Sequence, residues 1–301
     1  MVEGITLVRL DNGQSVDINM DDSPHYVLSS CSWGQVEGDA NTVKYVRQLG
    51  KTVLSSTVGT RDVKIVGWVV ADENGLMGSL KDFLNQFVSP LQFLKLLYDG
   101  KYVTFLPDKS VTYDTGYESN NDTIAKFTIT GTCYDPMWHD EYSSKFIAAE
   151  TVGMFHFPLE FHDTPTSSPE VVFASIVSNV MFELQNIGDV SSGFTVVFKS
   201  KGTVKNPYIK NIATQEKLTV KKTMVLGEAL TVSTVIGDRY VRQGELDDDG
   251  ASMFKYVDPD SDWLQLPVGT SLMTFGADVG ADVLDVYVVF ENQYLEVQGC
   301  Y

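Results

Sequence analysis

The second half of the chain consists of short segments in which apolar and polar residues alternate, separated by glycine, asparagine and aspartate turns. In the clearest segment, 283–290, one set of positions holds Leu284, Val286, Val288 and Phe290, and the positions between them hold Asp285, Tyr287 and Val289. Since successive side chains of a strand point to opposite faces, this alternation predicts strands with one buried face. The other strands predicted in this way are 180–186, 193–198, 217–222, 229–234 and 271–275. Evenly spaced strands with such turns favour a β-sandwich.

The first half of the chain combines strands with a helix. Residues 61–70 alternate as a strand does, with apolar residues at both sets of positions, so both faces of this strand are expected to be at least partly covered. After the turn residues 72–75 the apolar side chains recur at helical spacing, at Leu76, Leu80, Phe83, Leu84 and Phe87. Ser89-Pro90 ends this pattern, because proline cannot continue a helix.

A hairpin is predicted directly after the helix. Its turn is Asp99-Gly100, a dipeptide that readily takes the positive φ angles of a type I′ turn, and its strands are the apolar runs 93–98 and 101–106. Residues 125–133 then return as a further strand, and Asp135-Pro136-Met137-Trp138 closes the segment. The first half is therefore predicted to be a β structure with one helix and one hairpin.

Two domains are predicted from length and composition. A chain of 301 residues is long enough for two units that each bury a core of their own. Pro158, Pro165 and Pro169, three of its ten prolines, fall between residues 151 and 171, and residues 164–169 have the composition of a linker or long loop. We therefore expect a boundary in this region and divide the chain into residues 1–145 and 146–301.

The net charge excludes one class of function. The chain has 22 Lys and Arg against 40 Asp and Glu, with a formal net charge of −18, which repels phosphate backbones. Sequence-specific binding of nucleic acid is therefore not expected. No apolar run approaches the ~20 residues of a membrane-spanning helix, and the first residues lack the order of a secretory signal, so we expect folding in the cytoplasm. The three cysteines, Cys31, Cys133 and Cys300, are far apart and are expected to be buried, reduced thiols.

Several short motifs contain metal-ligating residue types, but each has a plainer explanation. His156, Glu160 and His162 would share one face of an extended segment, as zinc ligands can, yet their apolar neighbours fit a strand whose polar residues face water. His139-Asp140-Glu141 is interpreted as a solvated turn. The acidic runs 247–250 and 258–262 resemble calcium loops but lack the glutamate or the glycine that such a loop needs, so both predict turns.

The sequence contains no catalytic signature. Neither a Gly-x-Ser-x-Gly elbow nor a phosphate-binding glycine loop is present, and spacing alone nominates no carboxylate pair for sugar hydrolysis. We expect no catalytic, cofactor-binding or metal-binding residue, no cofactor and no enzyme activity, and an unrecognised glycoside hydrolase is the weakest alternative. A sugar-stacking platform is conceivable at Trp33, Trp68, Trp138 or Trp263. Trp263 alternates with apolar residues, which favours a role in packing.

Three motifs of the second half together resemble one family. Gly202–Pro207, Gly227–Leu230 and the sequence Trp263-Leu264-Gln265-Leu266-Pro267-Val268-Gly269 are similar to the C-terminal half of the distal tail proteins of long-tailed bacteriophages. The order of strand, helix, hairpin and strand before Asp135-Pro136 resembles the N-terminal domain of the same family more loosely. Thr270 and Ser271 stand where the family commonly has asparagine after the Pro-x-Gly turn, which weakens the match at this turn only.

The resemblance implies a fold and a function. In the family, the N-terminal domain packs a helix and a hairpin against a β-sandwich and builds a ring, and the C-terminal domain is a galectin-like β-sandwich. It implies a structural protein of the virion tail, assembled in the bacterial cytoplasm as a homohexameric ring through which DNA passes. Its expected partners are the tail-tube protein, a tail-tip hub or tail-associated fibre protein, and receptor-binding or baseplate proteins. The alternative from a different class is a carbohydrate-binding β-sandwich module in host adhesion.

Overall fold

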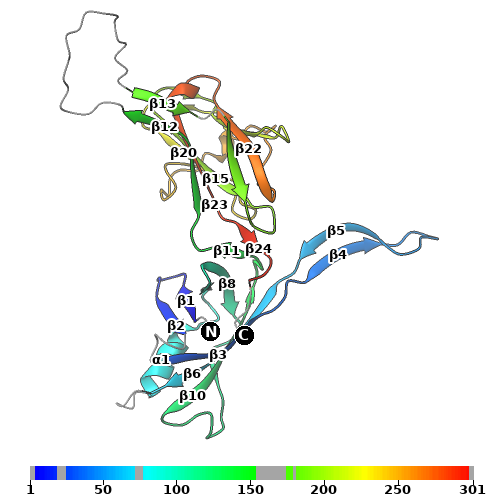
Figure 1. Ribbon diagram of the computed structural model, residues 1–301, viewed down its shortest axis with the longest axis vertical. Helices are drawn as coiled ribbons and strands as arrows, with labels where there is room; N and C mark the ends of the chain where they lie inside the picture. The colour runs from blue at the N-terminus through cyan, green and yellow to red at the C-terminus, as the bar shows by residue number, and fades with distance from the viewer. Residues whose placement is uncertain (1–3, 19–24, 72–76, 154–173, 179–180, 298–301) are drawn as a thin grey trace, which may run out of the picture. The chain divides into compact units, whose positions relative to one another are not determined.

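The computed structural model describes residues 4–18, 25–71, 77–153, 174–178 and 181–297, and it divides into two compact units. The first unit comprises Met1–Tyr142 together with Gln293–Tyr301, and the second comprises Ser143–Asn292 (Figure 1). The chain therefore passes from the first unit to the second and returns, whereas the division at 145 and 146 assigned every later residue to the second domain. The proline-rich segment 154–173 lies outside the described residues.

One large sheet forms the body of the first unit. Its strands follow the order β2-β1-β7-β8-β10-β6-β3, and β9, β11 and β24 pair with its members. The bounds are β1 (Ile5–Arg9), β2 (Ser15–Ile18), β3 (Tyr26–Trp33), β6 (Arg61–Val70), β7 (Leu94–Tyr98), β8 (Lys101–Pro107), β9 (Thr112–Tyr113), β10 (Ile124–Cys133), β11 (Trp138–Asp140) and β24 (Gln293–Tyr294). In β6 the side chains of Val63, Ile65 and Val69 are buried, and Val66, Trp68 and Val70 are half-buried, so both faces are covered as predicted.

The predicted helix and hairpin are both present in the first unit. Helix α1 (Met77–Phe87) buries Met77, Leu84 and Phe87 against the sheet and ends before Ser89-Pro90. Strands β7 and β8 form the hairpin, and its turn residues Asp99 and Gly100 have φ angles of 50° and 67°, as a type I′ turn requires. The positive φ angles explain why this dipeptide identified the hairpin so well.

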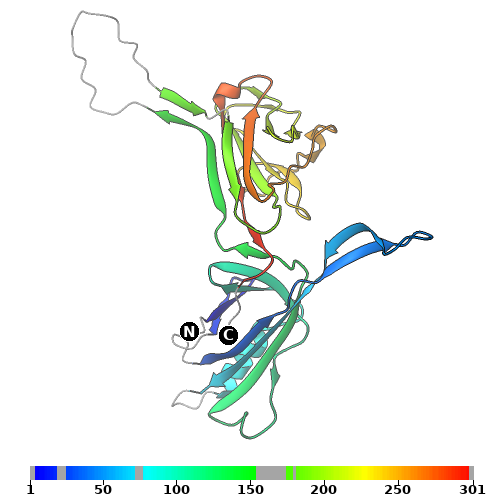
Figure 2. The ribbon, with the colours of Figure 1, turned by 45° about the vertical axis from the view of Figure 1, so that its right-hand side comes forward.

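The first unit also contains a two-stranded sheet, β4 (Gly38–Val43) and β5 (Thr52–Val58), which pair only with each other among the described strands. Figures 1 and 2 show this hairpin extending away from the large sheet. We call residues 38–58 the arm. No residue from 34 to 60 is buried, so the arm contributes nothing to the core of its own unit.

The second unit is a β-sandwich. Six strands follow the order β13-β12-β23-β15-β20-β21, four follow β14-β22-β17-β18, and β16 pairs with β19. Their bounds are β12 (Ser144–Gly153), β13 (Ala174–Ser178), β14 (Met181–Asn186), β15 (Phe194–Ser200), β16 (Val204–Lys205), β17 (Tyr208–Asn211), β18 (Lys217–Thr219), β19 (Thr223–Met224), β20 (Ala229–Ser233), β21 (Tyr240–Gln243), β22 (Gly269–Gly276) and β23 (Leu284–Phe290). Two 3-10 turns, η1 (Phe254–Tyr256) and η2 (Ala281–Val283), complete it.

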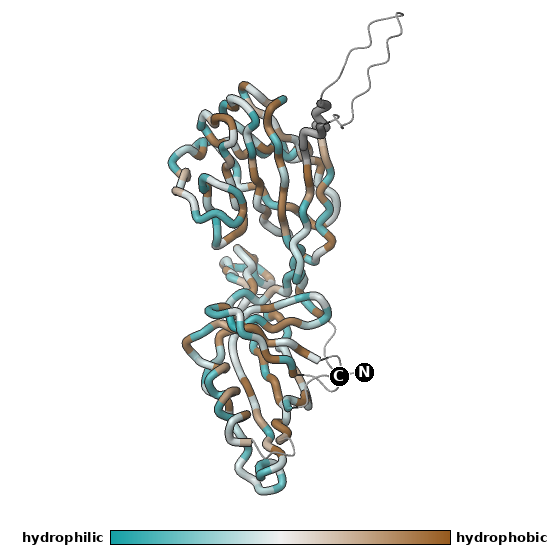
Figure 3. Tube along the Cα trace, turned by 90° about the vertical axis from the view of Figure 1, so that its left-hand side faces the viewer, coloured by the Kyte–Doolittle hydropathy of each residue, from teal (hydrophilic) through white to brown (hydrophobic). Residues whose placement is uncertain are grey.

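The alternating pattern of the sequence accounts for the core of this sandwich. Apolar side chains from the six-stranded sheet, including Val196 and Val288, meet side chains of the four-stranded sheet such as Ile209 and Met273 in one buried cluster. Along β23 the residues Leu284, Val286, Val288 and Phe290 are buried and those between them are half-buried. Figure 3 shows the resulting alternation of hydrophobic and hydrophilic positions along the strands. The prediction of a mainly β fold is confirmed.

In the described part of the chain, α1 is too short to cross a lipid bilayer, and no other helix there has the length and apolar character to do so.

Candidate functional site

The arm presents an unusual combination of exposed apolar and basic side chains at its tip. The arm tip, Lys44–Lys51, contains three basic residues and no acidic one in a chain whose net charge is −18. Between these basic residues, Tyr45, Val46 and Leu49 are 60%, 93% and 101% exposed. Three large, exposed apolar side chains within five residues make the arm tip a candidate interaction surface.

The conformation of the arm tip is held by its own hydrogen bonds. The side chain of Gln48 accepts a hydrogen bond from the backbone N–H of Tyr45 at 3.1 Å and donates one to Thr52 Oγ1 at 2.7 Å. Arg47 and Gly50 take positive φ angles of 67° and 87°, which reverse the chain between the strands. Because this turn is already fixed in the single subunit, binding through the apolar side chains would cost less conformational entropy.

Among the described strands, each strand of the arm has a partner on one side only. All seven residues of β5 are exposed, and among the described strands it pairs only with β4. An isolated two-stranded hairpin is marginally stable in water, and free strand edges are templates for pairing with another chain. The arm therefore has the physical properties of an interaction element.

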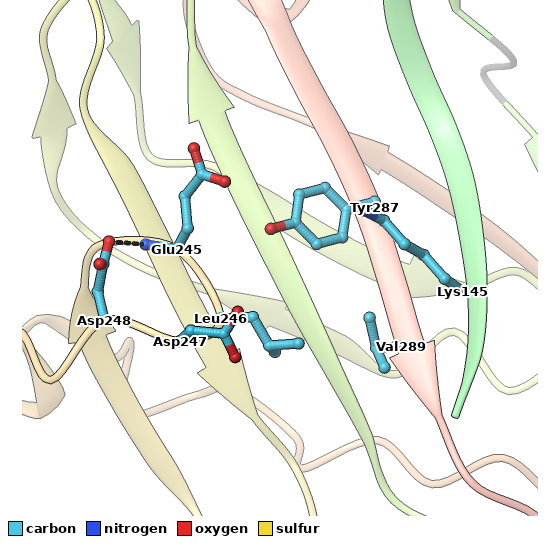
Figure 4. A pocket seen from close by; sticks show the side chains of 7 residues that line it. All are labelled: Lys145, Glu245, Leu246, Asp247, Asp248, Tyr287 and Val289. Carbon is cyan, nitrogen blue, oxygen red and sulfur yellow. Dashed lines mark hydrogen bonds between the residues drawn. The ribbon is translucent and has the colours of Figure 1, made fainter. Parts of the chain in front are cut away.

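A second surface is an open groove of about 500 Å³ on the outer face of the six-stranded sheet. It is lined by Lys145 from β12, Tyr287 and Val289 from β23, and Glu245, Leu246, Asp247 and Asp248 from the turn after β21 (Figure 4). The half-buried side chains of Tyr287 and Val289 lie here because the alternate residues of β23 point into the core. The groove thus offers an aromatic ring, two aliphatic side chains and charges of both signs.

Ion pairs and a cation–π contact organise the charges of the groove. Lys145 Nζ lies 4.3 Å from the centroid of the Tyr287 ring, and Glu245 Oε1 lies 2.5 Å from Lys199 Nζ. The hydrogen bond to Glu245 raises the pKa of Lys199, and burial raises the pKa of Tyr287, so both keep their protons at neutral pH. Asp248 Oδ2 accepts a hydrogen bond from the backbone N–H of Glu245 at 2.8 Å, which fixes the turn. The charges of Lys145 and Glu245 are thus engaged by neighbouring side chains.

The two histidine-containing motifs considered as metal sites do not form such a site in the described part of the chain. His156, Glu160 and His162 lie outside the described residues. His139 Nε2 lies 3.0 Å from Asp135 Oδ2, and its ring stacks on that of Tyr102 with centroids 5.2 Å apart. Across the described part of the chain, no group of three or more ligating side chains is assembled.

The two acidic runs form turns held by neighbouring cations. Asp258 Oδ1 lies 2.9 Å from Lys221 Nζ, and this lysine holds the pKa of the Asp258 carboxyl below its usual range. In the other run, Asp249 lies 3.5 Å from Arg242, and Gly250 approaches the Gln243 carbonyl so closely that no Cβ could be accommodated. Close backbone packing explains the glycine without a calcium ion.

The four tryptophans occupy packed positions. Trp33 and Trp138 are buried in the first core with ring centroids 4.9 Å apart, and Trp68 is half-buried in β6. Trp263 packs against the second core, and its ring is contacted by Phe254 at 5.6 Å and by the Arg239 guanidinium at 5.3 Å. These contacts restrict access to the Trp263 ring.

Cys31 and Cys133 are buried, as expected, and Cys300 lies outside the described residues. Burial raises the pKa of Cys133 to about 12, so it stays protonated and unreactive at neutral pH.

The sequence made further strands plausible within residues 1–60, but it did not identify the arm as a separate element, and it did not reveal the groove. The strands of the arm are rich in serine and threonine and bury nothing, so they lack the apolar alternation used to identify strands. A usable signal was present, since Lys44, Arg47 and Lys51 form a basic cluster in an acidic chain. The groove had no comparable signal, because its lining comes from three separate segments, at residue 145, at residues 245–248 and at residues 287–289, which come together only in the folded unit.

Residues 187–294 match the family model described as the siphovirus-type tail component, C-terminal domain. Among solved structures, the Dit protein (gp 19.1) of phage SPP1, described as a paradigm of the hub adsorption apparatus in phages that infect Gram-positive bacteria, is similar with a TM-score of 0.64. Its identity is 10%, and the similarity covers 96% of this chain and 98% of the SPP1 chain. No curated protein matches the chain.

Two structures of the phage P2 baseplate in its activated conformation also contain a similar chain. The structure with Ca gives a TM-score of 0.51 at 10% identity, covering 99% of this chain and 100% of that chain, and the structure with Sr gives 0.51 at 10%, covering 96% and 98%. At this identity the solved structures establish the fold. Together with the family match, they confirm the predicted resemblance to phage distal tail and baseplate hub proteins.

Proposed function

We propose that this protein is a structural subunit of a phage tail hub, forming a ring at the distal end of the tail that joins the tail tube to the tip or baseplate. Residues 187–294 carry a siphovirus-type tail component domain, and the fold extends over nearly the whole chain. The observation that carries the proposal is the arm, an exposed two-stranded element with an apolar, basic tip. The family is structural, which supports a non-enzymatic role.

The arm suits the kind of contact that closes a ring. When an element of one copy binds a different surface of the next copy, the contact is heterologous, and it forms a closed ring if the rotation between copies closes. An acidic chain provides acceptor surfaces for the basic arm tip. Six copies are expected from the resemblance to distal tail proteins. A net-negative lumen would let DNA pass without holding it, because phosphates are repelled over about 8 Å at physiological salt.

The proposed partners follow from this position in the tail. The ring would contact the tail-tube protein on one side and a tail-tip hub, tail-associated fibre or receptor-binding protein on the other. The subunit would act in the virion tail after assembly in the bacterial cytoplasm.

Reversal of the charges of the arm tip is expected to abolish the ring while leaving the subunit folded. The variant carries Lys44→Glu, Arg47→Glu and Lys51→Glu, which replace the basic residues without touching a core, since none of the three is buried. Light scattering and negative-stain electron microscopy should show six-fold rings for the natural sequence, at high concentration or with the tail-tube partner. The variant should remain monomeric with an unchanged melting temperature.

A matched control reverses three exposed lysines elsewhere, Lys109, Lys205 and Lys255, and changes the net charge by the same amount. This control should still form rings. A natural chain that stays monomeric when mixed with its tail-tube and tip neighbours would contradict the hub proposal. Rings that persist in the arm-tip variant would contradict the role given to the arm.

The groove beside Tyr287 is the observation that favours the second candidate, a carbohydrate-binding module. The partly exposed ring of Tyr287, flanked by carboxylates and a lysine, could provide both stacking and hydrogen bonding, as small-ligand sites do. If the protein is chiefly a hub, it should bind weakly or not at all on a glycan array.

Strong, selective glycan binding that is lost in Tyr287→Ala would promote this second function over the first. Binding lost only in Trp263→Ala would assign it to the tryptophan instead. Tyr117→Ala is a suitable control, because Tyr117 is exposed and lies in the first unit.

A further inference from the structure

The first unit is completed by a segment that follows the second unit in the sequence. We call Gln293–Val297 the closing segment. Its strand β24 pairs with β11, with Trp138 opposite Tyr294 and His139 opposite Gln293. Val297 is 8% exposed and belongs to the hydrophobic core of the first unit. The core is therefore built from both ends of the chain.

Two buried side chains of the first unit depend on this segment for their hydrogen bonds. Trp33 Nε1 donates to the carbonyl of Val297 at 3.3 Å, across 264 positions of sequence. Arg61, which is completely buried, donates through Nη2 to the carbonyl of Leu295, across 234 positions. Its Nε and Nη1 have no hydrogen-bond partner among the described residues. Without the Leu295 carbonyl, the buried guanidinium would lose its hydrogen-bond acceptor, at a large cost in folding free energy. The closing segment is therefore needed to stabilise this core.

Folding of the second unit brings the closing segment to its place. At the start of that unit, Ser144 and Lys145 of β12 pair with Phe290 and Val289 of β23. Ser143 Oγ donates to Glu291 Oε1 at 3.1 Å. The segment that enters the second unit, at Ser143, and the segment that leaves it, at Glu291, therefore lie side by side in that unit.

The last residue of the second unit is anchored as well. Asn292 is buried, and its Oδ1 accepts a hydrogen bond from the backbone N–H of Ile187 at 3.1 Å. When the second unit is folded, the closing segment thus begins at a fixed point beside the end of the first part of the chain. When that unit is unfolded, the segment is tethered by a long flexible loop, and the entropy of closing such a loop opposes its docking.

From this arrangement we infer that the stability of the first unit depends on the second unit, which must be folded to deliver the closing segment at a low entropic cost. The dependence runs one way, because the second unit is continuous in sequence and contains its own core. The arm belongs to the first unit, so the unit that carries it is most stable in a chain whose second unit is folded. This inference concerns the single subunit and does not require the ring.

Hydrogen exchange on the full chain tests the dependence, read separately in peptides of the two units. Val288→Asp places a carboxylate in the second core and opens that unit, whereas Val289→Asp, the neighbouring half-buried position, serves as the control. In Val288→Asp, the peptides of β3, β6 and β11 in the first unit should exchange faster by on the order of tenfold or more, because docking of the closing segment now requires closure of a long loop. In Val289→Asp they should exchange at the natural rate.

A variant in the closing segment supplies the reverse test. Val297→Asp should increase exchange around Trp33 and Arg61 and leave the peptides of β15 and β23 protected as before. The inference is overturned if the first unit keeps its natural protection when the second exchanges at the unfolded rate. It is equally overturned if Val297→Asp leaves the first unit unaffected. If Val288→Asp cannot be recovered in soluble form, Val288→Ala opens the same core more gently and is read in the same way.

Discussion

Val288→Asp is expected to lower the free energy of unfolding of the second unit by about 3 kcal/mol or more, the usual cost of burying a charge without a partner. Val288 is 0% exposed and lies in the centre of β23, between β12 and β15. The cluster around it consists of hydrophobic side chains, so the carboxylate would find no cation or hydrogen-bond donor. The measurement is the melting temperature, followed by circular dichroism, together with chemical denaturation.

Val289→Asp is the matched control for this prediction. Val289 is half-buried and faces the groove, where Lys145 also lies, so the new carboxylate remains near water and a cation. Its cost should stay within about 1 kcal/mol, as for most substitutions at positions that are not buried. Equal melting temperatures for the natural chain and Val288→Asp would show that the face assignment of β23 is wrong.

Trp138→Ala is expected to destabilise the first unit by about 3–5 kcal/mol, as large-to-small substitutions of buried aromatic side chains do. Trp138 is completely buried and is the largest such side chain among the described residues. Its ring contacts that of Trp33 edge to face, and its backbone pairs with Tyr294 of the closing segment. The substitution therefore removes core volume at the point where both ends of the chain meet.

The effect should be read from the first unit, because two units need not unfold together. Hydrogen exchange in peptides of β3 and β8 provides that reading. Trp68→Ala removes the same side chain from a half-buried position, where Lys126 lies over the ring at 5.9 Å, and should cost distinctly less. A similar loss of exchange protection in both variants would contradict the prediction that Trp138 stabilises the first unit more than Trp68 does.

Local sequence patterns predicted the elements whose stability is local. The Asp99-Gly100 turn specified β7 and β8 through its positive φ angles, and the alternation of 284–290 specified the inner face of β23. Residues 217–222 were predicted as one strand, but β18 ends at Thr219. The reason is tertiary, since the backbone N–H of Lys221 bonds to the Tyr256 carbonyl and the backbone N–H of Lys222 turns back to bond to the Val220 carbonyl.

Elements defined by distant contacts were beyond such patterns. Strand β24 has two residues and exists because Trp138 and His139 lie beside it, which no periodicity can reveal. The return of the chain to the first unit was missed for the same reason. The arm could not be predicted, because its exposed strands have no alternation of apolar and polar residues. The groove could not be predicted, because the turn that forms one of its walls lies over the sheet only in the folded unit.

The charge of the arm tip has a consequence for how the protein is handled. Attraction between exposed charges is screened within about 8 Å at physiological ionic strength and within about 3 Å at 1 M salt. A contact made through Lys44, Arg47 and Lys51 will therefore weaken as salt is added, whereas the part made through Val46 and Leu49 will not. If the arm closes the ring as proposed, buffers of high ionic strength should favour the separate subunit, and dilution into low salt should favour association.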